Sequence, residues 1–137
     1  MYNKAVPEMN SGQNTMRILG IDYGRVKVGI AIADGGLSEP LEVIRYTDIE
    51  LLINKILEIA QKEQVEKIVV GVSEGEMGKE SKEFADKIGA ETFDETLSTQ
   101  DAQELSRQAG IKRKKRKNME DAFAASVMLQ SYLDTNV

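Results

Sequence analysis

The sequence predicts an α/β fold in which helices flank a mixed five-stranded sheet. Short apolar or β-branched runs bounded by glycine and proline alternate with longer segments whose apolar residues recur at helical spacing. The runs follow the order three strands, helix, strand, helix, strand and two further helices. Three strands joined by short links form an antiparallel meander, whereas strands separated by helices pair in parallel. The sheet should therefore combine a three-strand meander with two parallel strands.

The meander is expected near the N-terminus. Its strands are residues 16–21, 27–33 and 41–46. Gly24 and Arg25 connect the first two strands, and Gly35, Gly36 and Pro40 separate the second from the third. In such a layout the first strand lies in the centre of the sheet, beside the strands that follow the first helix.

The first helix is predicted after Thr47, which forms a capping box with Glu50. Apolar residues then recur at helical spacing, namely Ile49, Leu52, Ile53, Ile56, Ile59 and Ala60. The strand that follows, residues 65–72, is nearly all apolar after Lys67. This composition is typical of a parallel strand that is covered on both faces.

The rest of the chain should alternate between short elements. Residues 74–78 are predicted to form a loop, residues 79–88 a helix ended by Gly89, and residues 91–94 a strand. A further helix should begin at Ser98, with Asp101 three residues on, and stop at Gly110. One face of a final helix carries Ala122, Ala125, Leu129, Tyr132 and Leu133.

Composition restricts the chemistry of any site. The 137 residues include no cysteine and no histidine, which excludes disulfides, thiolate nucleophiles, Cys-ligated zinc and imidazole bases. A catalytic centre must use carboxylates, hydroxyls, lysine, arginine or tyrosine, and carboxylates select hard cations such as Mg²⁺ or Mn²⁺. We expect a disordered leader over residues 1–15, one domain over residues 16–137, and a cytoplasmic protein without a membrane span.

Asp22 is the first candidate site residue. It follows the apolar Leu19 and Ile21 and precedes Gly24, so its carboxylate lies where a buried strand becomes a turn. Burial of an isolated carboxylate is costly unless the group is paired or binds a cation. Asp22 therefore indicates a metal or a cationic partner, although an aspartate that only caps the turn is the alternative.

Two further carboxylates fall where they could meet Asp22. Glu95 ends the fifth strand, and Asp121 lies in the first turn of the last helix. Carboxylates at neighbouring strand ends converge in this topology, so the three are predicted to form one acidic centre. Each also has a simpler explanation, because strand ends often carry a charge and a helix N-terminus favours an acid.

A run of six basic residues directly precedes the last helix. It consists of Lys112, Arg113, Lys114, Lys115, Arg116 and Lys117. The chain as a whole has 18 basic and 23 acidic residues, so outside this run 12 basic residues stand against 23 acidic ones, a net charge of −11. That distribution is typical of a contact with a polyanion, and a solvated loop is the simpler alternative.

Four segments resemble the motif blocks of the YqgF/RuvX family. They are GIDYGRVKVGIAIAD from Gly20, VVGVSEGEMGKES from Val69, FDETLSTQDA from Phe93 and NMEDAFAASVMLQSYLD from Asn118. The resemblance covers about residues 16–133. Members of this family are small bacterial proteins with an RNase H-like fold. They are related to RuvC-type Holliday junction resolvases and regarded as the nucleases that mature the 5′ end of pre-16S rRNA.

The resemblance implies a catalytic, metal-binding triad of Asp22, Glu95 and Asp121, with Lys27 as a nucleic-acid-binding residue. Mg²⁺ or Mn²⁺ held by the triad would activate water for phosphodiester hydrolysis. Whether one or two ions bind remains open, with further acidic residues available at Asp94 and Glu120.

Two positions depart from the family pattern. Thr96 follows the glutamate where the family has an arginine, and Ser73 stands where it has a proline. Without a guanidinium beside Glu95 the site lacks a bidentate phosphate clamp, so a reduced cleavage rate is expected.

The function expected from the resemblance is that of a metal-dependent endonuclease in 5′-end maturation of pre-16S rRNA. A Holliday junction resolvase-like DNA nuclease and a non-catalytic RNA-binding ribosome-assembly factor are the alternatives. The segment from Asp22 to Gly24 also resembles the phosphate-binding turn of actin-like ATPases, but that fold normally uses two such domains. The sequence does not determine the substrate or the oligomeric state.

Overall fold

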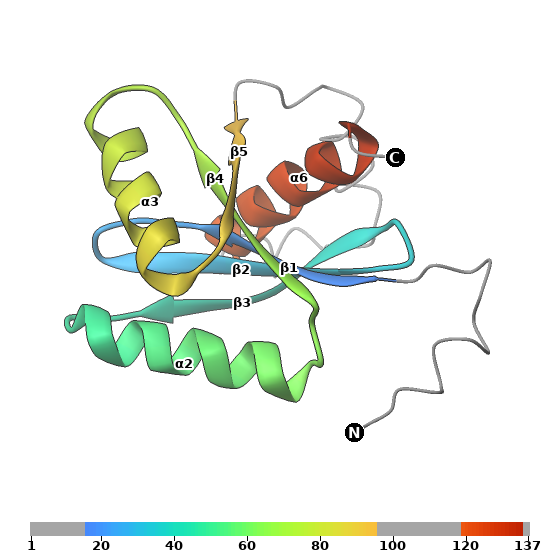
Figure 1. Ribbon diagram of the computed structural model, residues 1–137, viewed down its shortest axis with the longest axis horizontal. Helices are drawn as coiled ribbons and strands as arrows, with labels where there is room; N and C mark the ends of the chain where they lie inside the picture. The colour runs from blue at the N-terminus through green and yellow to red at the C-terminus, as the bar shows by residue number, and fades with distance from the viewer. Residues whose placement is uncertain (1–15, 96–118, 136–137) are drawn as a thin grey trace.

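The computed structural model describes residues 16–95 and 119–135. The elements in chain order are β1 (Arg17–Asp22), β2 (Lys27–Asp34), β3 (Ser38–Arg45), α2 (Ile49–Lys62), β4 (Lys67–Val72), α3 (Gly75–Ile88), β5 (Glu91–Asp94) and α6 (Glu120–Thr135). The strands form one sheet in the order β3-β2-β1-β4-β5 (Figure 1). β2 pairs antiparallel with β1 and β3, and β4 pairs parallel with β1 and β5. The predicted mixed sheet with a central first strand is confirmed.

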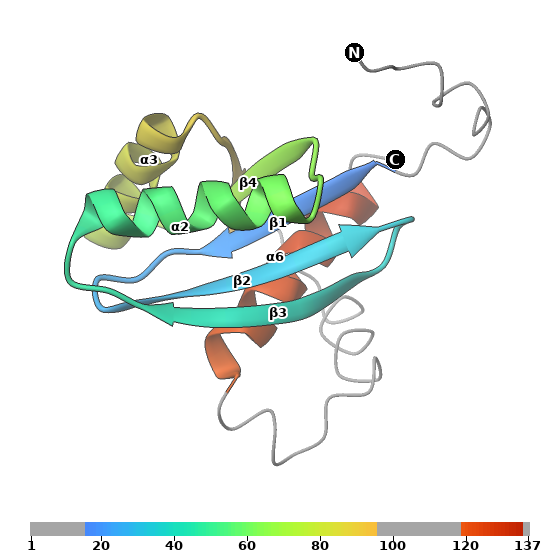
Figure 2. The same cartoon turned by 90° about the horizontal axis from the view of Figure 1, so that it is seen from below.

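Helices cover both faces of this sheet. α2 and α3 lie on one face, where Ile56 and Phe84 pack against Val70 and other buried strand residues. α6 lies on the opposite face, where Leu129 packs in a second cluster that includes Val69 (Figure 2). Because the neighbours Val69 and Val70 belong to different clusters, β4 is covered on both faces, as its composition predicted.

The start of α2 differs from the prediction. Asp48, not Thr47, is the N-cap residue, and its Oδ1 accepts hydrogen bonds from the amides of Glu50 at 2.8 Å and Leu51 at 3.4 Å. The predicted capping box of Thr47 and Glu50 is therefore wrong. An aspartate caps as well as a threonine, and its negative charge also complements the helix dipole.

β3 begins at Ser38, earlier than predicted, and includes Pro40 opposite Ala31. β3 is an edge strand, where a proline can be accommodated because one side of the strand needs no hydrogen-bond donor. The pairing register also shifts between Ile30 and Ala31. The assumption that Pro40 lies outside the strand therefore made the predicted turn between β2 and β3 too long.

The loop predicted over residues 74–78 is also wrong, because α3 already begins at Gly75. Gly78 lies so close to the chain before the helix that an added Cβ would be 1.6 Å from the carbonyl oxygen of Ser73. Glycine at this position marks a close approach of two backbone segments within a helix, not a break in the helix. The helix predicted from Ser98 to Gly110 lies outside the described residues.

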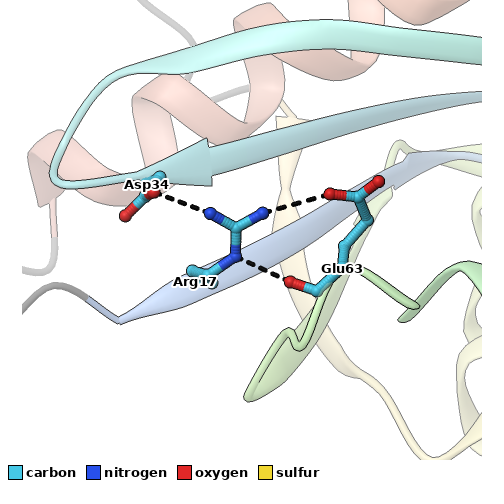
Figure 3. Close-up of polar contacts among 3 residues, drawn as sticks. All are labelled: Arg17, Asp34 and Glu63. Carbon is cyan, nitrogen blue, oxygen red and sulfur yellow. Dashed lines mark hydrogen bonds and ion pairs between the residues drawn. The ribbon is translucent and has the colours of Figure 1, made fainter. Parts of the chain in front are cut away.

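Arg17 begins β1, at the end of the strand opposite Asp22. Its side chain contacts Asp34 and Glu63 (Figure 3). Its Nε donates to the carbonyl oxygen of Glu63 at 2.7 Å, and its guanidinium pairs with Asp34 at 2.7 Å and with the Glu63 carboxylate at 3.1 Å. These contacts connect the start of β1 with the end of β2 and with the C-cap of α2.

None of the helices in the described ranges has the length and apolar character needed to cross a lipid bilayer.

Candidate active site

Asp22 ends the central strand on the face that α6 covers. It pairs in register with Gly29 of β2, and the residue before it, Ile21, pairs with Val70 of β4. Side chains alternate along a strand, so Asp22 shares a face with Ile18, which belongs to the α6-side cluster. Asp22 therefore lies between Gly29 of β2 and Gly71 of β4, beneath the start of α6.

Two glycines flank Asp22 and make room for the main chain of α6 at Asp121 and for the side chain of Glu95. A Cβ on Gly29 would lie 1.9 Å from the backbone oxygen of Asp121, and a Cβ on Gly71 would lie 2.8 Å from Oε2 of Glu95. Sequence analysis did not single out either glycine. The sequence signal that could have found them is a glycine inside a strand that is otherwise rich in apolar residues, because such a glycine often marks the close approach of another group.

The charges of these carboxylates interact. Burial is the largest cause that raises the pKa of Asp22 from 3.8 to about 7, and the negative charges of Glu95 and Asp121 raise it further. Burial also raises the pKa of Glu95, with a smaller contribution from the neighbouring charge of Asp94. The structure thus brings Asp22 within electrostatic reach of both other members of the predicted triad.

Asp121 has a cationic partner. Nζ of Lys27, at the start of β2, lies 3.1 Å from Oδ2 of Asp121, with side-chain exposures of 41% and 32%. An ion pair this exposed contributes only about 0–1 kcal/mol to stability. Lys27, predicted from the resemblance to bind nucleic acid, therefore contacts the acidic centre itself.

The turn between Asp22 and Lys27 is held by aromatic residues. The hydroxyl of Tyr46 donates to the carbonyl oxygen of Gly24 at 2.6 Å, and the ring of Tyr23 stacks on Phe84 of α3 at 4.6 Å between centroids. These contacts fix the backbone that carries Asp22 without using the face on which its carboxylate lies.

The donor set of this centre fits a hard divalent cation. Its members are carboxylate oxygens. Burial raises the pKa of Asp22 most, and repulsion from the other two carboxylates raises it further; a bound cation would relieve that repulsion. In the described residues no three acidic side chains lie close enough together to hold one ion between them. The groups required for a metal site are therefore adjacent, but they do not form a closed three-carboxylate shell.

The remaining predicted residues have different outcomes. Asp94 ends β5 and Glu120 begins α6, and both are exposed. Thr96 lies outside the described residues, and so does the basic run of Lys112, Arg113, Lys114, Lys115, Arg116 and Lys117. Their roles stay predictions.

Comparison with known proteins identifies the family. The sequence model of the RuvX family, described as Holliday junction resolvase, matches residues 16–135. The chain belongs to the RuvX family. A relative from Desulforamulus reducens is 37% identical over 134 residues, which cover 88% of this chain and 98% of the relative. A relative from Acetivibrio thermocellus is 35% identical over 136 residues, which cover 88% of this chain and 96% of the relative. Both carry the provisional name pre-16S rRNA nuclease.

Solved structures show the same fold as this RuvX family member. RuvC from Thermus thermophilus in complex with a Holliday junction superposes with a TM-score of 0.57 at 14% identity, covering 88% of this chain and 96% of RuvC. A second structure of Thermus thermophilus RuvC has a TM-score of 0.50 at 12% identity and covers 89% and 98% of the two chains. The predicted RNase H-like fold is confirmed.

Proposed function

We propose that this chain is a divalent-metal-dependent nuclease that hydrolyses phosphodiester bonds. The observation that carries the proposal is the position of Asp22, a partly buried carboxylate whose pKa is raised first by its burial and then by the charges of Glu95 and Asp121. Membership of the RuvX family supports nuclease chemistry, and the absence of histidine leaves carboxylates as the groups that can bind a catalytic ion.

Each residue of the centre has a distinct role in this proposal. Asp22, Glu95 and Asp121 would hold Mg²⁺ or Mn²⁺, which supplies a water of lowered pKa and stabilises the charge that develops on phosphate oxygens. Asp22 is placed by the central strand, and Asp121 by the close contact of α6 with Gly29. The Lys27 ammonium lies beside Asp121, where it can contact a phosphate of the substrate.

Precursor 16S rRNA is the proposed substrate, because relatives that match over nearly their whole length are named for it. The cytoplasm is the proposed place of action.

The deciding experiment incubates the purified protein and Mg²⁺ or Mn²⁺ with labelled precursor rRNA, single-stranded RNA and a four-way DNA junction in parallel. Selective cleavage of the rRNA precursor at its 5′ side supports the proposal. Selective cleavage of the junction would transfer the function to DNA, and no cleavage of any substrate would favour a non-catalytic RNA-binding factor.

Divalent ions should stabilise the fold. Because binding to the folded state alone stabilises it by RT ln(1 + [L]/Kd), millimolar Mg²⁺ or Mn²⁺ should raise the melting temperature, and EDTA should reverse the effect. Differential scanning fluorimetry measures this directly. A melting temperature that ignores both ions but rises with ATP would contradict the metal proposal and favour nucleotide binding.

The basic run should supply phosphate contacts. Replacement of Lys114, Lys115 and Arg116 with alanine should weaken RNA binding and reduce the slope of log K against log salt by about 0.7–0.9 for each phosphate that is no longer neutralised. Fluorescence anisotropy across a salt series measures both quantities.

The control for this variant replaces three exposed lysines, namely Lys55, Lys62 and Lys87, on the helices that cover the opposite face of the sheet from α6. It removes the same charge and should leave the slope unchanged. Equal slopes for wild type and both variants would show that the basic run is only a solvated segment.

A further inference from the structure

Lys27 is positioned to affect metal binding. It begins β2, and its ammonium reaches across to the first turn of α6, where it lies 3.1 Å from Oδ2 of Asp121. Of the ion pairs within the described ranges, this is the one that includes a member of the acidic triad. The pair thus places a positive charge beside one of the three proposed metal ligands.

An ammonium and a divalent ion cannot share Asp121 without a penalty. Both are attracted to the same carboxylate group, and two positive charges on one carboxylate repel each other. The pair is also easily broken, because 41% of the Lys27 side chain is exposed and its long stem can carry the ammonium into solvent.

The arrangement of the acidic centre agrees with this competition. After burial, the charges of Glu95 and Asp121 both raise the pKa of Asp22. No three acidic side chains in the part of the chain that the structure describes are grouped so that they could hold one ion. In this arrangement the Asp121 carboxylate faces the Lys27 ammonium at 3.1 Å.

We propose that Lys27 is a displaceable internal cation, which neutralises Asp121 in the metal-free protein and gives way when a divalent ion takes Asp121 as a ligand. The inference rests on the proposed function, because it assigns a role at the proposed metal site. It makes Lys27 a positioning residue that lowers the metal affinity of the free enzyme.

Metal affinity provides the test. Isothermal titration calorimetry with Mn²⁺ should show that Lys27→Met binds the ion about two- to fivefold more tightly than wild type, the factor that corresponds to loss of an exposed ion pair. Lys27→Arg keeps a cation beside Asp121 and should bind Mn²⁺ nearly as weakly as wild type. If Lys27 only fastened β2 to α6, Lys27→Met would lower the melting temperature in EDTA without tightening Mn²⁺ binding.

Lys67→Met is the matched control. Lys67 pairs with Glu91 at 3.2 Å with side-chain exposures of 36% and 45%, and it lies at the opposite end of the strands from Asp22. Its removal changes the net charge equally and should leave Mn²⁺ affinity unchanged. Equal tightening in Lys67→Met, or unchanged or weaker Mn²⁺ affinity in Lys27→Met, would overturn the proposed role of Lys27 but not the proposed metal dependence. A wild-type protein that binds no Mn²⁺ at millimolar concentration would overturn both this role and the proposed metal dependence.

Discussion

Asp22→Asn is expected to abolish cleavage while making the folded protein more stable at pH 8 in EDTA. Activity should be lost because the variant removes the central carboxylate of the proposed metal site, and a metal ion binds an amide oxygen less strongly than a carboxylate. Stability should rise because the amide, like the protonated acid, carries no charge. In the wild type the negative charge of Asp22 is disfavoured by burial and by the two neighbouring carboxylates.

The sign of the pH dependence follows from the direction of the shift. The pKa of Asp22 is raised from 3.8 to about 7 in the folded protein, so the unfolded chain loses this proton first as the pH rises. The stabilising contribution of protonated Asp22 is complete below pH 3.8 and is lost as the pH rises to about 7. The advantage of Asp22→Asn should therefore grow across this range to at most about 4 kcal/mol and stay constant above it.

Urea unfolding at pH 4, 6 and 8, combined with the nuclease assay, checks both parts. Asp86→Asn is a suitable control, since it removes one negative charge from an exposed site on α3 and should change neither cleavage nor the pH profile. Retained cleavage in Asp22→Asn would place the activity elsewhere or in a contaminant. Equal stability of wild type and variant at pH 8 would show that the Asp22 carboxylate is well solvated.

The sheet and the positions of the acidic residues could be predicted because both depend on chain order. β4 follows the meander through a helix and pairs in parallel with β1 instead of with the edge strand β3, which places the first strand in the centre and brings its C-terminal end next to that of β4. Asp22 ends β1, Glu95 directly follows β5, and Asp121 lies in the first turn of a helix that contains small residues such as Ala122. These features are local in sequence and have direct consequences for the fold.

The features that could not be predicted depend on three-dimensional contacts, some between neighbouring turns of the chain and some between distant elements. Gly78 reads as a helix breaker until the carbonyl of Ser73 is seen to occupy the place of its side chain. The pair between Lys27 and Asp121 joins residues on different elements, and the resemblance alone indicated only a nucleic-acid contact. Close approach of backbones and pairing across the sheet are set by tertiary packing, which overrides local preference.

Gly29→Ala is expected to combine a large loss of stability with a large loss of activity. The new Cβ would lie 1.9 Å from the backbone oxygen of Asp121, 2.2 Å from its carbonyl carbon and 2.7 Å from the amide nitrogen of Ala122. These atoms belong to the main chain of α6 and cannot rotate away, so the start of the helix must move by about 1 Å or more from β2. Overpacking of this kind costs about 3 kcal/mol, which corresponds to a fall in melting temperature of about 10 °C.

The same displacement moves Asp121 relative to Asp22, and a misplacement of about 1 Å at a catalytic centre can lower the rate about 100-fold. Gly35→Ala is the matched control, because it adds the same methyl group where nothing lies within 4 Å but where φ is +78°. Its cost should be limited to about 1–2 kcal/mol of backbone strain, with cleavage by the folded protein unchanged. Melting curves and cleavage rates for the two variants therefore separate a methyl group that displaces α6 from one that only strains a turn. Near-native values for Gly29→Ala in both measurements would show that the contact between β2 and α6 does not position Asp121.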